Sequence, residues 1–168
     1  MLLSDTHKIF IDLLRVSISR RDSLSHVPSA EEWISLYALS VKQALAGVCF
    51  VGVQRLPKEQ REEMSKGLMM QWFALAEQIG QRNEVMNRRC VELQRMLEKE
   101  GMKGCILKGQ SIAELYNLNL NGESNLGLYR LSGDIDVWVD AGRDDVIGYG
   151  HYVYEGVGLR QMMDLYFT

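Results

Sequence analysis

The stretch that decides the fold of this chain is Ser132-Gly133-Asp134-Ile135-Asp136-Val137-Trp138-Val139. If it forms a strand, its side chains alternate between two faces, so that Asp134 and Asp136 share one face. The apolar side chains between and after them take the other face and anchor the strand in a core. Two carboxylates this close repel each other unless a cation lies between them, and a divalent metal is the simplest candidate.

Length and charge restrict the class of protein. The 168 residues suffice for one ordinary domain, or for a helical unit joined to a small α/β unit, with a real hydrophobic core. The formal net charge of -3 gives no general basic field, so nucleic acid and anionic membrane surfaces are disfavoured as partners. The most apolar run, residues 44–53, is about half of the ~20 residues that a membrane span needs.

The cysteines and the N-terminal residues indicate a compartment. Cys49, Cys90 and Cys105 are widely spaced and form no C-x-x-C pair, so neither a disulfide framework nor a zinc site is indicated. Residues 1–10 carry charged side chains, beginning with Asp5, too early for the apolar core of a signal peptide. We therefore expect a soluble protein of the reducing cytoplasm.

The N-terminal part of the chain carries helical patterns, and we expect a helical region over residues 1–100. A first helix is predicted to end between residues 20 and 25. Ser29 and Glu32 then form an S-x-x-E capping box, directly before an apolar stripe over residues 33–48 that predicts one helix.

A longer helix is expected after Pro57, a residue that suits a first helical turn. Apolar side chains recur with a period of 3.6 residues over positions 72–97. Glycine is frequent just beyond a helix C-terminus, so Gly101 predicts where this helix stops.

After residue 101 the pattern changes to short strands and a helix. Residues 104–107 and 131–139 predict strands, and residues 109–116 predict a helix between them. We expect residues 101–168 to form a small α/β core with a helix that closes it at the C-terminal end. The chain as a whole is then an α+β protein, with the helical region packed on a small sheet.

The junction between the first predicted strand and the following helix is a candidate anion site. Gly109 allows the backbone to come close to a phosphate, and the free N–H groups and dipole of the helix N-terminus favour negative charge there. A strand-glycine-helix turn is common, and alternating acids also occur on exposed strands. Together with the carboxylate pair, however, the turn has the parts needed to bind a metal-nucleotide complex.

At this point the residues resemble a known family. The chain is similar to the polymerase-β-type nucleotidyltransferase superfamily, and more narrowly to its bacterial branch of uncharacterised nucleotidyltransferase-like proteins. The helices through Trp33 and through Trp72 and Asn83 also resemble that branch, as do residues 156–164. The core of the resemblance lies in the motifs Leu107-Lys108-Gly109-Gln110-Ser111, Leu115-Tyr116 and Arg130-x-x-Gly133-Asp134-Ile135-Asp136-Val137-Trp138-Val139.

The resemblance implies a mixed sheet, with the glycine turn after its first strand and the aspartates on its second. Asp134 and Asp136 would be catalytic and would hold Mg²⁺, or Mn²⁺, which bridges the triphosphate of a nucleoside triphosphate. The nucleotidyl group would pass to an unknown acceptor by in-line attack on the α-phosphorus, with pyrophosphate as the leaving group.

Four further residues take nucleotide-binding roles by the same resemblance. Gly109 and the Ser111 hydroxyl would contact the β- and γ-phosphates. Lys108 and Arg130 would neutralise the triphosphate, or would instead pair with the aspartates as structural ions.

The chain departs from the family pattern in two places. Gln110 separates Gly109 from Ser111, where the superfamily usually has Gly-Ser or Gly-Gly. After Val139, the chain has no counterpart of the middle of the catalytic domain, and no third carboxylate stands at a matching position. A sheet shortened in this way has unpaired edges, which favours a homodimer or strand exchange.

A second function stays open on these residues. The helices make up much of the chain, and the third carboxylate of the family is not visible. The alternative is therefore a noncatalytic helical interaction module that carries a degenerate nucleotidyltransferase core.

Overall fold

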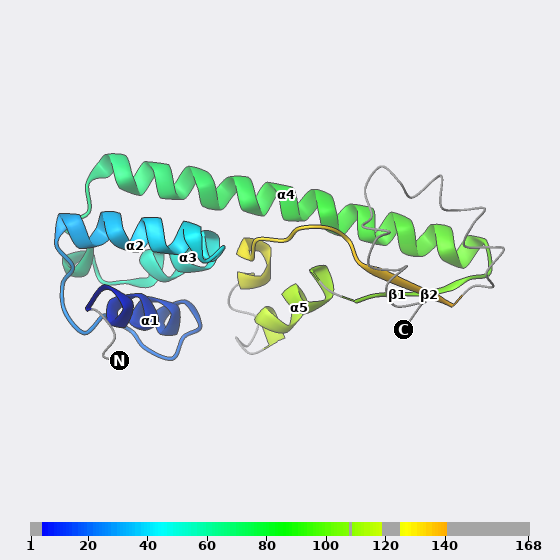
Figure 1. Cartoon of the computed structure of the whole chain (residues 1–168), viewed down its shortest axis with the longest axis horizontal. Coiled ribbons are helices and arrows are strands. Elements are labelled where there is room, and N and C mark those ends of the chain that lie inside the picture. Colours follow the sequence, from blue (N-terminus) through cyan, green and yellow to red (C-terminus); the bar gives the residue numbers. More distant parts are fainter. Residues whose placement is uncertain (1–4, 108, 119–124, 141–168) are drawn as a thin grey trace.

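One long helix, α4, runs the length of the molecule in the computed structural model and carries all the other elements along one side (Figure 1). The structure describes residues 5–107, 109–118 and 125–140. The predicted C-terminal closing helix lies outside these residues. The elements are α1 (Asp5–Ser17), α2 (Ala30–Lys42), α3 (Ala46–Arg55), the 3₁₀ helix η1 (Lys58–Arg61), α4 (Lys66–Lys99), β1 (Lys103–Ile106), α5 (Gln110–Leu118), the 3₁₀ helix η2 (Leu126–Tyr129) and β2 (Val137–Asp140).

The α+β class predicted from the sequence is confirmed, as is the start of α2. The Ser29 side chain accepts a hydrogen bond from the Glu32 amide, and the Glu32 carboxylate accepts one from the Ser29 amide at 2.9 Å. This reciprocal capping box satisfies two amides that a helix start would otherwise leave unpaired.

The single helix expected over residues 33–48 is wrong, because the chain turns at Ala44. This residue has a φ of 57°, and its amide bonds the Val41 carbonyl while the Leu45 amide bonds that of Ser40. These two bonds form a Schellman motif, which usually uses glycine and here uses alanine. The apolar stripe therefore belongs to two helices, α2 and α3.

The first core lies among α1, α2, α3 and the N-terminal half of α4. Trp33 and Trp72 are both fully buried in it. The Trp72 indole also donates a hydrogen bond to the Ala46 carbonyl over 2.8 Å, which ties the first residue of α3 to α4. Indole N–H groups usually find such a partner when the ring is buried.

The start and the end of α4 differ in how well the sequence predicts them. Pro57 does not open this helix: it precedes η1, and α4 begins after Ser65, whose hydroxyl accepts from the Leu68 amide. At the other end Gly101 has a φ of 73°, and α4 stops at Lys99 as predicted. No helix among residues 5–107, 109–118 and 125–140 is long and apolar enough to cross a membrane.

The described sheet consists of β1 and β2, paired antiparallel with Lys103 opposite Asp140 and Ile106 opposite Val137. One face of this sheet packs on the C-terminal half of α4. The second core forms there; its buried members are Met86, Cys90, Leu97, Ile135 and Val137.

The strand predicted over residues 131–139 is confirmed only over its last three residues, 137–139. Residues 131–136 are extended but lie outside the strand, apart from one bond from the Leu107 amide to the Asp136 carbonyl at 2.9 Å. Within this segment the Ser132 hydroxyl bonds Gln110 of α5, and directly before it the Leu128 and Arg130 carbonyls bond Asn83 of α4.

The 3₁₀ helix η2 packs on α3, α4 and α5, and its position requires a glycine in α3. A Cβ atom on Gly47 would lie only 2.3 Å from the Tyr129 carbonyl oxygen, closer than real contacts allow. Leu126, at the other end of η2, is 1% exposed and packs on Val48 and Val51.

Gly47→Ala should therefore lower the free energy of unfolding by about 1–3 kcal/mol, because the new methyl group forces η2 off α3. Urea denaturation followed by circular dichroism measures this. Gly67→Ala is the matched control, since a Cβ there meets nothing nearer than the Ser65 hydroxyl at 4.0 Å. That variant should be neutral or more stable by up to about 1 kcal/mol. Equal stability of the two variants would contradict the packing described here.

Candidate nucleotide site

The glycine turn and the two aspartates lie at the same end of the sheet. Gly109 has a φ of 61°, a conformation that side chains rarely adopt, and it directly precedes α5. A Cβ atom on it would lie 3.2 Å from the Asp134 carbonyl oxygen. The backbone of the turn thus runs against the backbone of the segment that carries the aspartates.

Asp134 and Asp136 share one face, as the alternation in the sequence predicts. Asp134 is exposed and Asp136 half-buried, whereas Ile135 and Val137 are each 4% exposed and pack toward α4. Both carboxylates therefore lie on the side of this segment that faces away from α4. The bond from Leu107 to the Asp136 carbonyl places this residue directly beside the end of β1.

The Ser111 hydroxyl lies in the first turn of α5 and donates a hydrogen bond to the Leu107 carbonyl over 2.8 Å. In this arrangement it links the helix back to the end of β1. The phosphate contact expected for this hydroxyl stays a prediction.

Arg130 also acts on the turn, through its side chain. One of its guanidinium nitrogens, Nη1, donates to the Gly109 carbonyl at 3.2 Å and to the Ser132 hydroxyl at 3.5 Å. Within the described part of the chain it forms no ion pair with Asp134 or Asp136, so the structural pairing considered from the sequence is not what the structure shows. Lys108, the other candidate cation, lies outside the described residues.

A buried polar network holds the turn in place, and the sequence analysis did not find it. Gln110 is 7% exposed; its amide nitrogen donates to the Asn87 side chain at 2.7 Å and to the Asn83 carbonyl at 3.3 Å. Its amide oxygen accepts from the Ser132 hydroxyl at 2.7 Å. One side chain therefore connects α4, the start of α5 and the segment before the aspartates.

Asn83 extends this network. It is 2% exposed and its side-chain nitrogen donates to the carbonyls of Leu128 and Arg130, each at 2.6 Å. Asn83 lies inside the buried apolar stripe of α4, whereas Asn87, one helical turn further on, is exposed. A polar residue in the middle of an apolar stripe is the signal that could have revealed the network.

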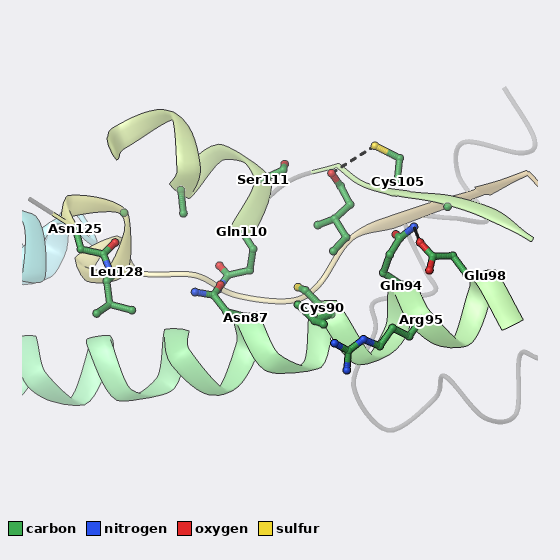
Figure 2. Close-up of a pocket in the computed structure, with 15 residues that line it drawn as sticks. Asn87, Cys90, Gln94, Arg95, Glu98, Cys105, Gln110, Ser111, Asn125 and Leu128 are labelled. Carbon is green, nitrogen blue, oxygen red and sulfur yellow. Dashed lines mark hydrogen bonds between the residues drawn. The ribbon is translucent and has the colours of Figure 1, made fainter. Parts of the chain in front are cut away.

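A cavity of about 730 Å³ lies between α4, β1, α5 and η2 (Figure 2). Asn87 and Gln94 of α4 form one wall, and Cys105 and Ser111 lie across from them. The aspartates do not line this cavity.

The carboxylate pair suits a metal that arrives together with a phosphate ligand. Among the residues that the structure describes, no three His, Cys, Asp or Glu side chains form a metal-binding group. Two carboxylates supply only oxygen atoms, which Mg²⁺ prefers, and Mg²⁺ commonly takes one or two carboxylates, with water and substrate phosphates as its other ligands.

The role of Gln110 can be tested by removing its amide. Gln110→Leu should lower the free energy of unfolding by about 1–3 kcal/mol, because it leaves the buried Ser132 hydroxyl and the Asn83 carbonyl without this partner. Amide hydrogen exchange should become faster in α5 and in residues 131–136. Gln94→Leu is the control: its side chain bonds only the exposed Glu98 carboxylate, and its effect should stay below about 0.5 kcal/mol. Unchanged exchange in both variants would contradict the network.

The cysteines test whether the sheet face away from α4 is open. Cys105, which is exposed on β1, should react first with a thiol reagent at mildly alkaline pH. Burial raises the pKa of the Cys90 thiol and raises that of Cys49 to about 12, so both stay protonated and react slowly. Cys49 should react only after unfolding. The absorbance of the chromophore that the reagent releases follows the successive phases of the thiol reaction. Cys105→Ser should remove the fastest phase. A fast phase that persists in this variant would show that another thiol is accessible.

Comparison with known proteins agrees with the motifs. Neither a search of curated proteins nor a search of solved structures finds a match. A family model described as uncharacterised nucleotidyltransferase matches residues 29–147, which include the capping box of α2, the glycine turn and both aspartates. Because this match covers well over half of the chain, the protein belongs to this family of uncharacterised nucleotidyltransferases.

Proposed function

We propose that the protein binds a nucleoside triphosphate together with Mg²⁺ and transfers the nucleotidyl group to an acceptor whose identity is open. One observation carries the proposal. Gly109, with its φ of 61°, lies against the backbone of Asp134, so an anion-binding helix start and a pair of carboxylates lie side by side. Membership of the nucleotidyltransferase family supports the same reading.

Each part of the site has a role in this proposal. Asp134 and Asp136 hold the Mg²⁺, which neutralises charge on the triphosphate and on the leaving pyrophosphate. The first amides of α5 have no partner within the helix, and they receive the phosphates beside Gly109, where no side chain blocks the approach. The Ser111 hydroxyl can turn from the Leu107 carbonyl toward a phosphate oxygen, because it is a rotatable donor.

Arg130 contributes positive charge and position. Its guanidinium holds the Gly109 carbonyl, and a planar guanidinium with five donors retains free N–H groups for a phosphate. The lysine that precedes the glycine, Lys108, is proposed to neutralise the triphosphate in the same way.

The alternative of a noncatalytic helical interaction module is not favoured. The family match extends over the glycine turn and the aspartates as well as over the helices. A helical interaction module would not need the buried polar network that holds Gly109 beside Asp134.

Replacing either aspartate should weaken nucleotide binding. In Asp134→Asn and Asp136→Asn, the affinity for a Mg²⁺–nucleoside triphosphate should fall at least about tenfold, or about 1.4 kcal/mol, because one negative charge on the metal is lost. Isothermal titration calorimetry with each of the common triphosphates measures this. Asp22→Asn, an exposed acid in the helical part, is the charge-matched control and should bind as the wild type does. Wild-type affinity in both aspartate variants would refute the proposal.

Metal and nucleotide should bind cooperatively, because two carboxylates alone give Mg²⁺ too few ligands. Mg²⁺ titrated without nucleotide should show weak binding, and EDTA should greatly reduce the affinity for the triphosphate. The transfer step is tested by release of pyrophosphate in the presence of Mg²⁺. Nucleotide affinity that does not change with EDTA would contradict the metal role of the two aspartates.

A further inference from the structure

The side of the chain that faces away from α4 continues from the two aspartates onto the sheet. We call it the outer face and define it by Asp134, Asp136, Trp138, Leu107 and Cys105. Trp138 follows Asp136 by two residues and stands opposite Cys105 in the register. Leu107 bonds the Asp136 carbonyl and is 40% exposed, while its neighbour Ile106 packs into the second core.

Trp138 differs from the other two tryptophans of the chain. Trp33 and Trp72 are fully buried, whereas Trp138 is 48% exposed. Its large aromatic ring lies half in water on the same side as the carboxylate pair, where a ligand held by the carboxylates can reach it. Leu107 and Cys105 add an apolar floor on the neighbouring strand.

Along the outer face, the residues follow the same order as the phosphates, sugar and base of a nucleotide. The glycine turn and Asp134 come first, Asp136 follows, and Trp138 comes about 7 Å further along the strand, at the usual rise per residue. A triphosphate held at the turn and the carboxylates would extend its sugar along β2. The base would then reach the indole ring.

We propose that Trp138 stacks on the base of the nucleoside triphosphate; this inference rests on the proposed function and adds the base-binding residue to it. Stacking on an aromatic ring accepts any base, because every base has a π face, so Trp138 supplies affinity with little choice among the bases. Asp140 and Lys103 lie opposite each other beyond Trp138. They are the polar groups that the edge of the stacked base would face.

Intrinsic fluorescence tests this directly, because Trp138 is the exposed tryptophan in a chain with two buried ones. In the protein without ligand, acrylamide should quench one class of tryptophan strongly, and Trp138→Phe should remove that class. A Mg²⁺–nucleoside triphosphate should quench the same emission and protect it from acrylamide. Mg²⁺–tripolyphosphate, which has no base, should bind but leave the emission of Trp138 unchanged.

Affinities of variants provide the second readout. Trp138→Leu should weaken the binding of the nucleoside triphosphate about tenfold, whereas Trp138→Phe, which keeps a ring, should lose much less. Tripolyphosphate should bind both variants as tightly as it binds the wild type, which also shows that the site is folded. Met70→Ala removes an exposed apolar side chain of α4 far from the sheet and should change neither affinity.

Three results would overturn the inference. The first is a quenchable tryptophan class that survives Trp138→Phe, because the ring would then be covered. The second is a Trp138→Leu variant that binds the nucleotide as tightly as the wild type does. The third is a Trp138→Leu variant that loses affinity for the nucleotide and for tripolyphosphate to the same extent. If the wild type binds neither nucleotide nor tripolyphosphate, the proposed function itself fails; if it binds both and only the tryptophan results fail, the base contact alone is wrong.

Discussion

The arrangement of the site depends on one buried amide, the side chain of Asn83 in the middle of α4. Its nitrogen donates to the carbonyls of Leu128 and Arg130, both at 2.6 Å, although these residues follow it by more than forty positions. A buried carbonyl without a partner would cost about 1–3 kcal/mol, so the pairing specifies where the chain must pass. It sets the path of the segment that leads from η2 to the aspartates.

The network also separates two hydrophobic cores that share α4. Ile79 lies on the helical side and Cys90 on the side of the sheet, and Asn83 and Asn87 occupy the turns between them. Apolar contact is non-directional and would allow the sheet to slide along the helix, whereas hydrogen bonds demand one register. The polar turns therefore give the second core its position relative to α5 and the glycine turn.

Local signals in the sequence were reliable where a single residue or a short pattern suffices. The capping box at Ser29, the stop at Gly101 and the shared face of Asp134 and Asp136 needed no partner from elsewhere in the chain. The turns at Ser19 and Ala44 were missed. Both are Schellman motifs with a positive φ at a residue other than glycine, so the residue type at these positions does not indicate the turn.

The sequence by itself determined the α+β class, the family and the identity of the acidic pair, because these follow from periodicity and from motifs of adjacent residues. Only the tertiary structure decided that Gln110 is a buried connector, that Arg130 holds the turn, and that residues 131–136 leave the sheet. It also decided that Trp138 is the tryptophan left exposed beside the carboxylates. The reason is physical: burial and the pairing of polar groups depend on segments far apart in the chain, and no local pattern contains that information.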